Sequence, residues 1–138
     1  MRVVGLDIGD RRVGIAVSDE TGTIAVPRGV YSRRSEDEDI AHLAQLARDV
    51  EATAIVAGLP LNLDGTEGDQ ARRTRTLAEA VAERSGIPLH YVDERLTSVE
   101  AERAMIEGGL SRRSRKGRTD ALSAVLILQA WLDRGRQS

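Results

Sequence analysis

The sequence predicts an α/β fold in which a mixed β-sheet is covered on its faces by helices. Three observations support this class. The N-terminal part holds three valine- and isoleucine-rich segments separated only by short turns, as in an antiparallel meander. The rest of the chain alternates short apolar runs with stretches of helical periodicity. The length of 138 residues is typical of one compact domain, so we expect residues 1–138 to form a single domain.

The first three strands are predicted over residues 2–8, 13–18 and 24–31. The four residues between the first two segments, Gly9-Asp10-Arg11-Arg12, are short enough for a hairpin. A Glu20-Thr21-Gly22 turn precedes the third segment.

The first helix follows this meander. Ser35 and Glu38 have the spacing of a capping box, in which the first residue accepts a hydrogen bond from the backbone of the fourth. The apolar residues behind them recur on one helical face: Ile40, Leu43, Ala44, Ala47 and Val50.

A strand, a helix and a further strand come next. Residues 53–57 form a short apolar run closed by Gly58 and Pro60, which is typical of a buried strand. Thr66 and Asp69 repeat the capping-box spacing and predict the start of a second helix, which Gly86 ends. Residues 87–92 are then the fifth strand.

The C-terminal part is predicted to be helical. Thr97 and Glu100 again have the capping-box spacing, ahead of a short helix that Gly108-Gly109 stops. A basic loop should follow, and the last helix should run from about residue 119 to 132. Its apolar residues cover most of its circumference, so we expect it to be buried against the sheet.

The charges are balanced in number but uneven in place. Twenty cationic residues oppose 22 acidic ones, and Lys116 is the only lysine. One basic cluster contains no acid, which favours contact with a polyanion, although a solvated loop has the same composition. The cluster consists of Arg112, Arg113, Arg115, Lys116 and Arg118.

Several classes of protein are excluded by composition. The chain has no cysteine, which removes disulfides, thiolate nucleophiles and zinc ribbons, and two histidines alone cannot build a zinc site. No apolar run is long enough to span a membrane. Because the chain starts without a signal-peptide pattern, we expect a cytoplasmic location.

Asp7 is the first candidate functional residue. It interrupts an apolar strand, where an unpaired carboxylate is costly, and Gly5 and Gly9 flank it. A strand-end aspartate that accepts backbone hydrogen bonds is the structural alternative. The two glycines leave room for a ligand and favour a site.

Two further acidic positions could join Asp7. Asp93-Glu94-Arg95 directly follows the fifth strand, where open α/β sheets place their ligands, although a solvated turn is the alternative. Asp120 begins the last helix, where an acid also stabilises the helix dipole. Because strand 53–57 should lie between Asp7 and this loop, Glu94 needs its long side chain to reach, and Asp93 is the fallback ligand. Three such carboxylates favour Mg²⁺ or Mn²⁺ over zinc.

Five segments in order resemble one family over nearly the whole chain. They are Val4-Gly5-Leu6-Asp7-Ile8-Gly9, Gly14-Ile15-Ala16-Val17-Ser18-Asp19, Gly58-Leu59-Pro60-Leu61-Asn62, Asp93-Glu94-Arg95-Leu96-Thr97 and Lys116-Gly117-Arg118-Thr119-Asp120-Ala121. Together they resemble the YqgF/RuvX family of bacterial RNase H-like nucleases. The resemblance implies an RNase H-like five-stranded mixed sheet with helices on both faces. It also implies a metal-dependent nuclease that acts in pre-16S rRNA processing or in Holliday-junction resolution.

The resemblance also implies roles for particular residues. Asp7, Glu94 and Asp120 correspond to the acidic triad that holds Mg²⁺ or Mn²⁺ and cleaves a phosphodiester. The expected nucleic-acid contacts are Arg95, Arg112, Arg113, Arg115, Lys116 and Arg118. The substrate class, an rRNA precursor or branched DNA, and a homodimer are left open, and no membrane partner is expected. The alternatives are a catalytically silent nucleic-acid-binding scaffold and a domain related to actin-like ATPases.

Overall fold

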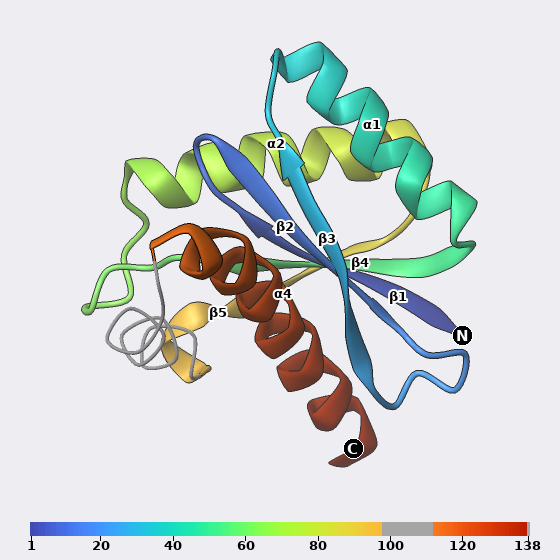
Figure 1. Cartoon of the computed structure of the whole chain (residues 1–138). Helices are drawn as coiled ribbons and strands as arrows, with labels where there is room; N and C mark the ends of the chain where they lie inside the picture. The colour runs from blue at the N-terminus through green and yellow to red at the C-terminus, as the bar shows by residue number, and fades with distance from the viewer. Residues whose placement is uncertain (98–111, 138) are drawn as a thin grey trace.

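The computed structural model describes the backbone of residues 1–97 and 112–137, and the side chains of residues 1–97 and 121–135. This part contains five strands and three long helices (Figure 1). The elements are β1 (Arg2–Ile8), β2 (Arg12–Ser18), β3 (Ala25–Ser32), α1 (Glu36–Asp49), β4 (Ala52–Leu59), α2 (Asp69–Ser85), β5 (Leu89–Asp93), the 3₁₀ turn η1 (Glu94–Leu96) and α4 (Arg112–Gln137).

The sheet is mixed, as the sequence predicts. Its strand order is β3-β2-β1-β4-β5. The pairs β1–β2 and β2–β3 are antiparallel, which confirms the meander, whereas β4 runs parallel to both β1 and β5. Strand β4 therefore separates β1 from β5, and the C-terminal ends of these three strands lie at one edge of the sheet.

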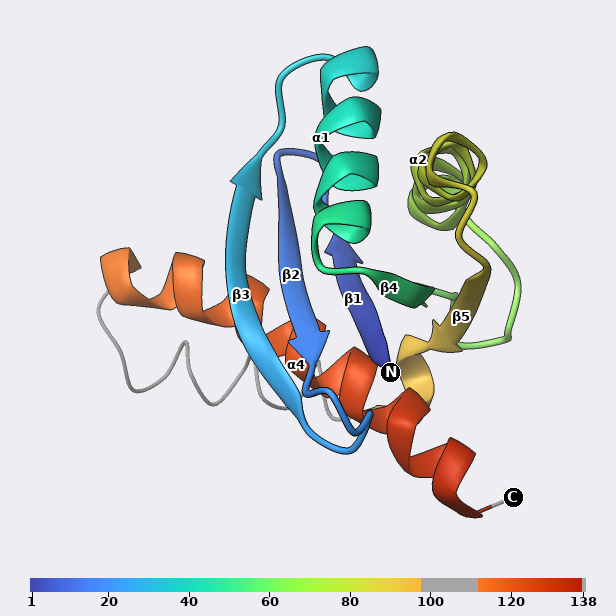
Figure 2. The same cartoon turned by 90° about the vertical axis from the view of Figure 1, so that its right-hand side faces the viewer.

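Helices cover both faces of the sheet (Figure 2). Helices α1 and α2 bury their apolar stripes against one face, where Leu43 and Leu77 meet Leu6 and Ile55 in one cluster. Helix α4 covers the other face through Ala124, Ile127, Leu128 and Leu132. The predicted α/β class with helices on both faces is therefore confirmed.

Helix α1 begins as predicted, but α2 does not. Ser35 is the N-cap of α1, and its hydroxyl accepts a hydrogen bond from the Glu38 backbone N–H at 3.2 Å. The expected cap Thr66 is wrong, because α2 starts at Asp69 behind Gly68. The Asp64 carboxylate instead accepts both the N–H and the hydroxyl of Thr66, at 3.0 and 2.6 Å, and this keeps Thr66 in a turn.

The last helix starts earlier than predicted. Helix α4 begins at Arg112, so the segment expected to be a basic loop lies in its first turns. Arginine and lysine are good helix formers, and a helix of 26 residues tolerates the cost of about 1 kcal/mol that Gly117 brings. The short helix predicted after Thr97, with its end at Gly108-Gly109, lies outside the described residues.

Candidate active site

Asp7 lies near the C-terminal end of the central strand β1, on the face covered by α4. Its neighbours Leu6 and Ile8 point to the opposite face and belong to the core under α1 and α2. The Asp7 residue is 8% exposed, and its register partner on β2 is Gly14, which has no side chain. Asp7 therefore lies on a strand, as predicted, and the residue beside it on β2 leaves space next to its carboxylate.

Gly5 explains how closely α4 approaches this part of the sheet. A Cβ at Gly5 would lie 2.7 Å from the Leu128 Cβ and 3.2 Å from the Ala124 carbonyl oxygen. The first of these contacts is shorter than real Cβ atoms show, and the second is tighter than most of them. The helix therefore packs on the bare backbone of β1, one side-chain position away from Asp7.

Glu94 reaches across β4 toward Asp7. A Cβ at Gly58, on the intervening strand, would lie 2.8 Å from Glu94 Oε1 and 2.4 Å from Ile127 Cδ1. The missing side chain at Gly58 leaves the space through which the carboxylate passes. Because β4 lies between β1 and β5, as the sequence predicts, the long side chain of Glu94 has to cross β4 to come near Asp7.

Asp7 and Glu94 line one cavity of about 210 Å³. Its other lining residues come from the end of β1, the β1–β2 turn, the start of β2, the loop after β4 and the first turn of α2: Ile8, Gly9, Asp10, Arg12, Pro60 and Gln70. The carboxylates of Asp7, Asp10 and Glu94 thus share a small cavity with one guanidinium and one amide, at the C-terminal edge of the sheet.

Asp93 has a different role from its neighbour. Its carboxylate accepts the Arg95 backbone N–H at 2.9 Å and forms an ion pair with the Arg95 guanidinium at 2.7 Å. These contacts with Arg95 lower the pKa of Asp93 below its usual value. Of the two adjacent acids, Glu94 lies in the cavity and Asp93 fixes η1.

Asp120 lies in α4, and its side chain is outside the described part. Helical periodicity puts position 120 one turn before Ala124 and two turns before Ile127, on the stripe that meets Gly5 and Gly58. Among residues 1–97 and 121–135, no three acidic or histidine side chains form a group that could hold a metal ion.

The predicted nucleic-acid contacts fall into two places. Five of them lie in the first turns of α4, where only the backbone is described: Arg112, Arg113, Arg115, Lys116 and Arg118. Arg95 lies on η1, and besides Asp93 its guanidinium donates to the Leu63 carbonyl oxygen at 3.1 Å. Its side chain is 37% exposed at the same edge of the sheet.

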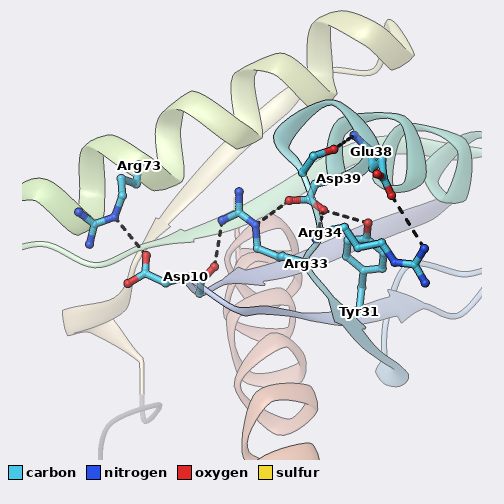
Figure 3. Close-up of polar contacts among 9 residues, drawn as sticks. Asp10, Tyr31, Arg33, Arg34, Glu38, Asp39 and Arg73 are labelled. Carbon is cyan, nitrogen blue, oxygen red and sulfur yellow. Dashed lines mark hydrogen bonds and ion pairs between the residues drawn. The ribbon is translucent and has the colours of Figure 1, made fainter.

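The turn between β1 and β2 is held from the side of α1 (Figure 3). Arg33 donates to the Gly9 carbonyl oxygen at 3.1 Å and to the Asp39 carboxylate at 2.9 Å. The buried Asp39 also accepts hydrogen bonds from the Tyr31 hydroxyl and the Arg34 backbone N–H. Burial by itself would raise the pKa of Asp39, but these three donors outweigh it and the pKa is lowered.

The same turn is held from α2. Arg73 forms an ion pair with Asp10 at 3.1 Å (Figure 3). The Gln70 amide donates to the Ile8 carbonyl oxygen at 3.4 Å and accepts from Arg73 at 2.8 Å. The backbone that follows Asp7 is thus connected to both helices on the far face of the sheet.

Sequence reasoning did not single out Arg12, Gln70 or the passage over Gly58. Arg12 closes the hairpin that begins two residues after Asp7, so its closeness to the carboxylate was readable from the predicted turn. Gln70 offers no such signal, because its position depends on where α2 starts.

A larger cavity of about 720 Å³ lies between β3 and α1, away from the paired carboxylates. Tyr31 and His42 stack within it at a ring-centroid distance of 4.1 Å. Its one acidic lining residue, Glu38, forms an ion pair with Arg34 at 3.9 Å. The larger cavity therefore lacks the grouped carboxylates that distinguish the smaller one.

None of the helices in the described part is both long enough and apolar enough to cross a membrane.

Relatives that match nearly the whole chain in sequence are named as nucleases. A relative from Anaeromyxobacter dehalogenans strain 2CP-1, named as a candidate pre-16S rRNA nuclease, is 48% identical over 134 residues, which are 97% of this chain and 98% of the relative. A relative of the same name from Syntrophomonas wolfei is 44% identical and covers 98% of this chain and 96% of its own length.

Solved structures confirm the RNase H-like resolvase fold. Thermus thermophilus RuvC, solved with a Holliday junction substrate, superimposes with a TM-score of 0.62 over 100% of this chain and 98% of its own, at 19% identity. The profile of the RuvX family, described as Holliday junction resolvase, matches residues 1–134. The chain therefore belongs to the RuvX family.

Proposed function

We propose that this chain is a divalent-metal-dependent nuclease whose site is formed by Asp7, Glu94 and Asp120. One observation carries the proposal: the carboxylates of Asp7, on β1, and Glu94, in the turn directly after β5, line one cavity, and Gly58 on the strand between β1 and β5 makes room for Glu94. Membership of a family described as a resolvase supports it. We further propose that residues 1–138 act as one nuclease domain, located in the cytoplasm.

The donor set of the cavity suits Mg²⁺ or Mn²⁺. Its acidic donors are carboxylate oxygens, and neither a thiolate nor an imidazole is among its lining residues in the described part. Hard cations prefer such oxygen ligands. Asp7, Glu94 and Asp120 would hold the ions, which supply an activated water and charge stabilisation at the leaving oxygen.

The residues of the chain would position the substrate around these ions. Asp7 is fixed by the ladder of a central strand, and Glu94 by the 3₁₀ turn that Asp93 caps. Arg12 adds a cation to the cavity itself, where a phosphate oxygen can accept its hydrogen bonds. Arg95 and the basic turns of α4 would contact flanking phosphates, which position a nucleic acid without reading its bases.

The substrate class is structured nucleic acid. The relatives are named for pre-16S rRNA and the family for Holliday junctions. We propose a precursor of 16S rRNA as a substrate and a four-way DNA junction as the second one to test. With only two tyrosines and one tryptophan, the chain should recognise backbone and shape more than bases.

The test is a cleavage assay on both substrates with Mg²⁺ or Mn²⁺, comparing the unsubstituted protein with Asp7→Asn. The variant should be inactive yet melt at the same or a higher temperature, because a charge is removed from an acidic cluster. Undiminished cleavage by folded Asp7→Asn would overturn the proposal.

The two alternatives give different results in companion assays. A silent scaffold would bind nucleic acid without cleaving either substrate and would give no calorimetric signal on titration with metal. A domain related to actin-like ATPases would show saturable binding of a nucleotide.

A further inference from the structure

Two apolar side chains are exposed at the C-terminal edge of the sheet, where the cavity with Asp7 and Glu94 lies. Leu63, in the loop between β4 and α2, is 94% exposed, and Leu96, at the end of η1, is 63% exposed. The other large apolar side chains exposed in the described residues belong to the opposite end of the sheet: Met1, Ile24 and Val26. Figure 1 shows the β4–α2 loop extending beyond the strand ends on the side where η1 lies.

The loop that carries Leu63 is held rigidly by its own hydrogen bonds. The Asn62 backbone N–H donates to the Thr66 carbonyl oxygen at 2.9 Å, and the Gly65 N–H donates to the Asn62 carbonyl oxygen at 2.8 Å. Asn62 and Asp64 also bond the Thr66 hydroxyl, at 3.0 and 2.6 Å. Gly65 turns the chain with a φ of 87°, which favours glycine. A closed turn thus presents Leu63 near its tip.

Arg95 connects this turn to the carboxylate cavity. Its guanidinium donates to the Leu63 carbonyl oxygen at 3.1 Å while Asp93 holds it in an ion pair. The residue before it, Glu94, lines the cavity, and the residue after it is Leu96. The backbone of Leu63 is therefore fixed relative to a proposed metal ligand through one side chain.

We propose that Leu63, supported by Leu96, is an apolar wedge that packs against an unstacked base beside the phosphate to be cleaved. This inference rests on the proposed nuclease function. A single exposed leucine is ordinary, but two on adjoining turns beside the cavity form a candidate contact. A nucleic acid whose phosphodiester occupies the cavity would pass this loop, because Arg95, which follows the cavity residue Glu94, binds the Leu63 carbonyl oxygen. Leucine cannot hydrogen-bond phosphate, but it can cover the face of a base and take the place of a stacking partner.

The occupant is the branch point of a junction or the boundary between paired and single-stranded nucleic acid. Bases at such points unstack at low cost, whereas bases inside a regular duplex do not. The wedge should therefore favour branched or interrupted substrates over continuous duplex, and it should do so without base-specific hydrogen bonds.

The experiment places the fluorescent base 2-aminopurine at the branch point of a four-way junction and at the strand boundary of an rRNA-precursor fragment. Binding is followed with Ca²⁺ in place of Mg²⁺, and cleavage with Mg²⁺. The unsubstituted protein should raise the fluorescence by unstacking the base. Leu63→Ser should lose the rise and cleave the branched substrate roughly tenfold more slowly, as expected when one apolar side chain no longer covers the base. Leu63→Phe, which keeps an apolar side chain at this position, should keep both the fluorescence rise and the cleavage rate.

Matched controls separate the wedge from general effects. Ile24→Ser removes another exposed apolar side chain, 57% exposed, at the opposite end of the sheet, and should change neither signal. Melting temperatures should not change, because Leu63 buries almost nothing.

Two results would overturn the inference while leaving the proposed function intact. One is an unchanged fluorescence rise and cleavage rate in Leu63→Ser. The other is sedimentation showing that Leu63→Ser instead breaks a self-associated form of the protein, with no effect on the base signal. Failure of the unsubstituted protein to cleave any substrate would overturn the proposed function and the wedge together.

Discussion

Glu94 passes over Gly58, and the space where a Cβ of residue 58 would lie is bounded by the Glu94 carboxylate and by Ile127 of α4. The Glu94 Oε1 is 2.8 Å from that Cβ position, and the Ile127 Cδ1 is 2.4 Å from it. A single glycine thus serves the packing of a core helix and the placement of a proposed metal ligand.

Gly58→Ala should impair both the packing of α4 and the placement of Glu94. Overpacking against Ile127 should lower the free energy of unfolding by about 1–3 kcal/mol. Displacement of Glu94 should slow cleavage by about 100-fold, the size of effect that a misplacement near 1 Å can have. Denaturant melts and cleavage rates measure the two effects separately.

A second substitution distinguishes them. Ile127→Val removes the Cδ1 atom, which is the nearest obstacle, and keeps Cγ1 at 3.0 Å, but it leaves Glu94 in conflict with the new methyl group. The double variant Gly58→Ala/Ile127→Val should therefore regain part of the lost stability and stay slow in cleavage. Recovery of both properties would mean that Glu94 is not constrained by residue 58.

The two adjacent acids should respond differently to substitution. Glu94→Asp shortens the side chain that must cross β4, so cleavage should fall by about 100-fold although the charge is kept. Asp93→Asn weakens an ion pair near the surface, worth about 0–1 kcal/mol, and should leave cleavage within a few-fold of the unsubstituted rate. If Asp93→Asn is inactive and Glu94→Gln is active, then Asp93 and not Glu94 is the metal ligand.

Much of the fold is readable from the sequence because its signals are local and strong. Valine- and isoleucine-rich runs with short turns predict β1, β2 and β3, and the Ser35 cap predicts the start of α1. The order of elements also predicts that β4 separates Asp7 from Glu94, which the sheet confirms.

Three features are not predicted from the sequence: the start of α2, the start of α4 and the role of Gly58. Each depends on which of several contacts a residue makes. Thr66 has the spacing of a helix cap, but Asp64 is closer in sequence and binds both of its polar groups. The first turns of α4 carry many charges, which suggested a loop, although arginine favours helix. The role of Gly58 depends on side chains from η1 and α4, which no local pattern relates to it.

Asp39 should stabilise the β1–β2 turn from a distance. Its carboxylate is buried and accepts hydrogen bonds from Tyr31, Arg33 and Arg34. Asp39→Ala should lower the free energy of unfolding by about 3 kcal/mol, at the low end for a broken buried pair, because the 20% exposed Arg33 side chain can be rehydrated. Chemical denaturation measures this change, and an unchanged midpoint would contradict it.

The lowered pKa of Asp39 has a defined consequence for stability against pH. Because the folded pKa lies below the unfolded value of about 3.9, the unfolded chain takes up the proton first as the pH falls. The contribution is complete above that value and is lost as the pH drops through the folded pKa. Asp39→Asn should flatten the decline in stability below about pH 4.

Asp19 provides the matched control for this titration. The Thr21 hydroxyl and the backbone N–H groups of Thr23 and Ile24 lower its pKa to about 2. It lies at the opposite end of the sheet, in the β2–β3 turn. Asp19→Asn should therefore flatten the same acid limb and leave cleavage at neutral pH unchanged. Equal acid limbs for both variants and the unsubstituted protein would contradict the linkage.

The basic turns of α4 should bind phosphates rather than bases. Replacing Arg112, Arg113 and Arg115 with alanine should weaken binding to all sequences alike and flatten the dependence of log affinity on log salt, by roughly 0.7–0.9 units for each phosphate that is no longer neutralised. The helix should survive, since alanine is the strongest helix former. Calorimetric titration with Mn²⁺ should show unchanged metal binding. The matched control replaces Arg72, Arg73 and Arg75 of α2, each of which forms an ion pair with a carboxylate. An unchanged salt slope in the α4 variant and a flattened one in the α2 variant would move the phosphate contacts to α2.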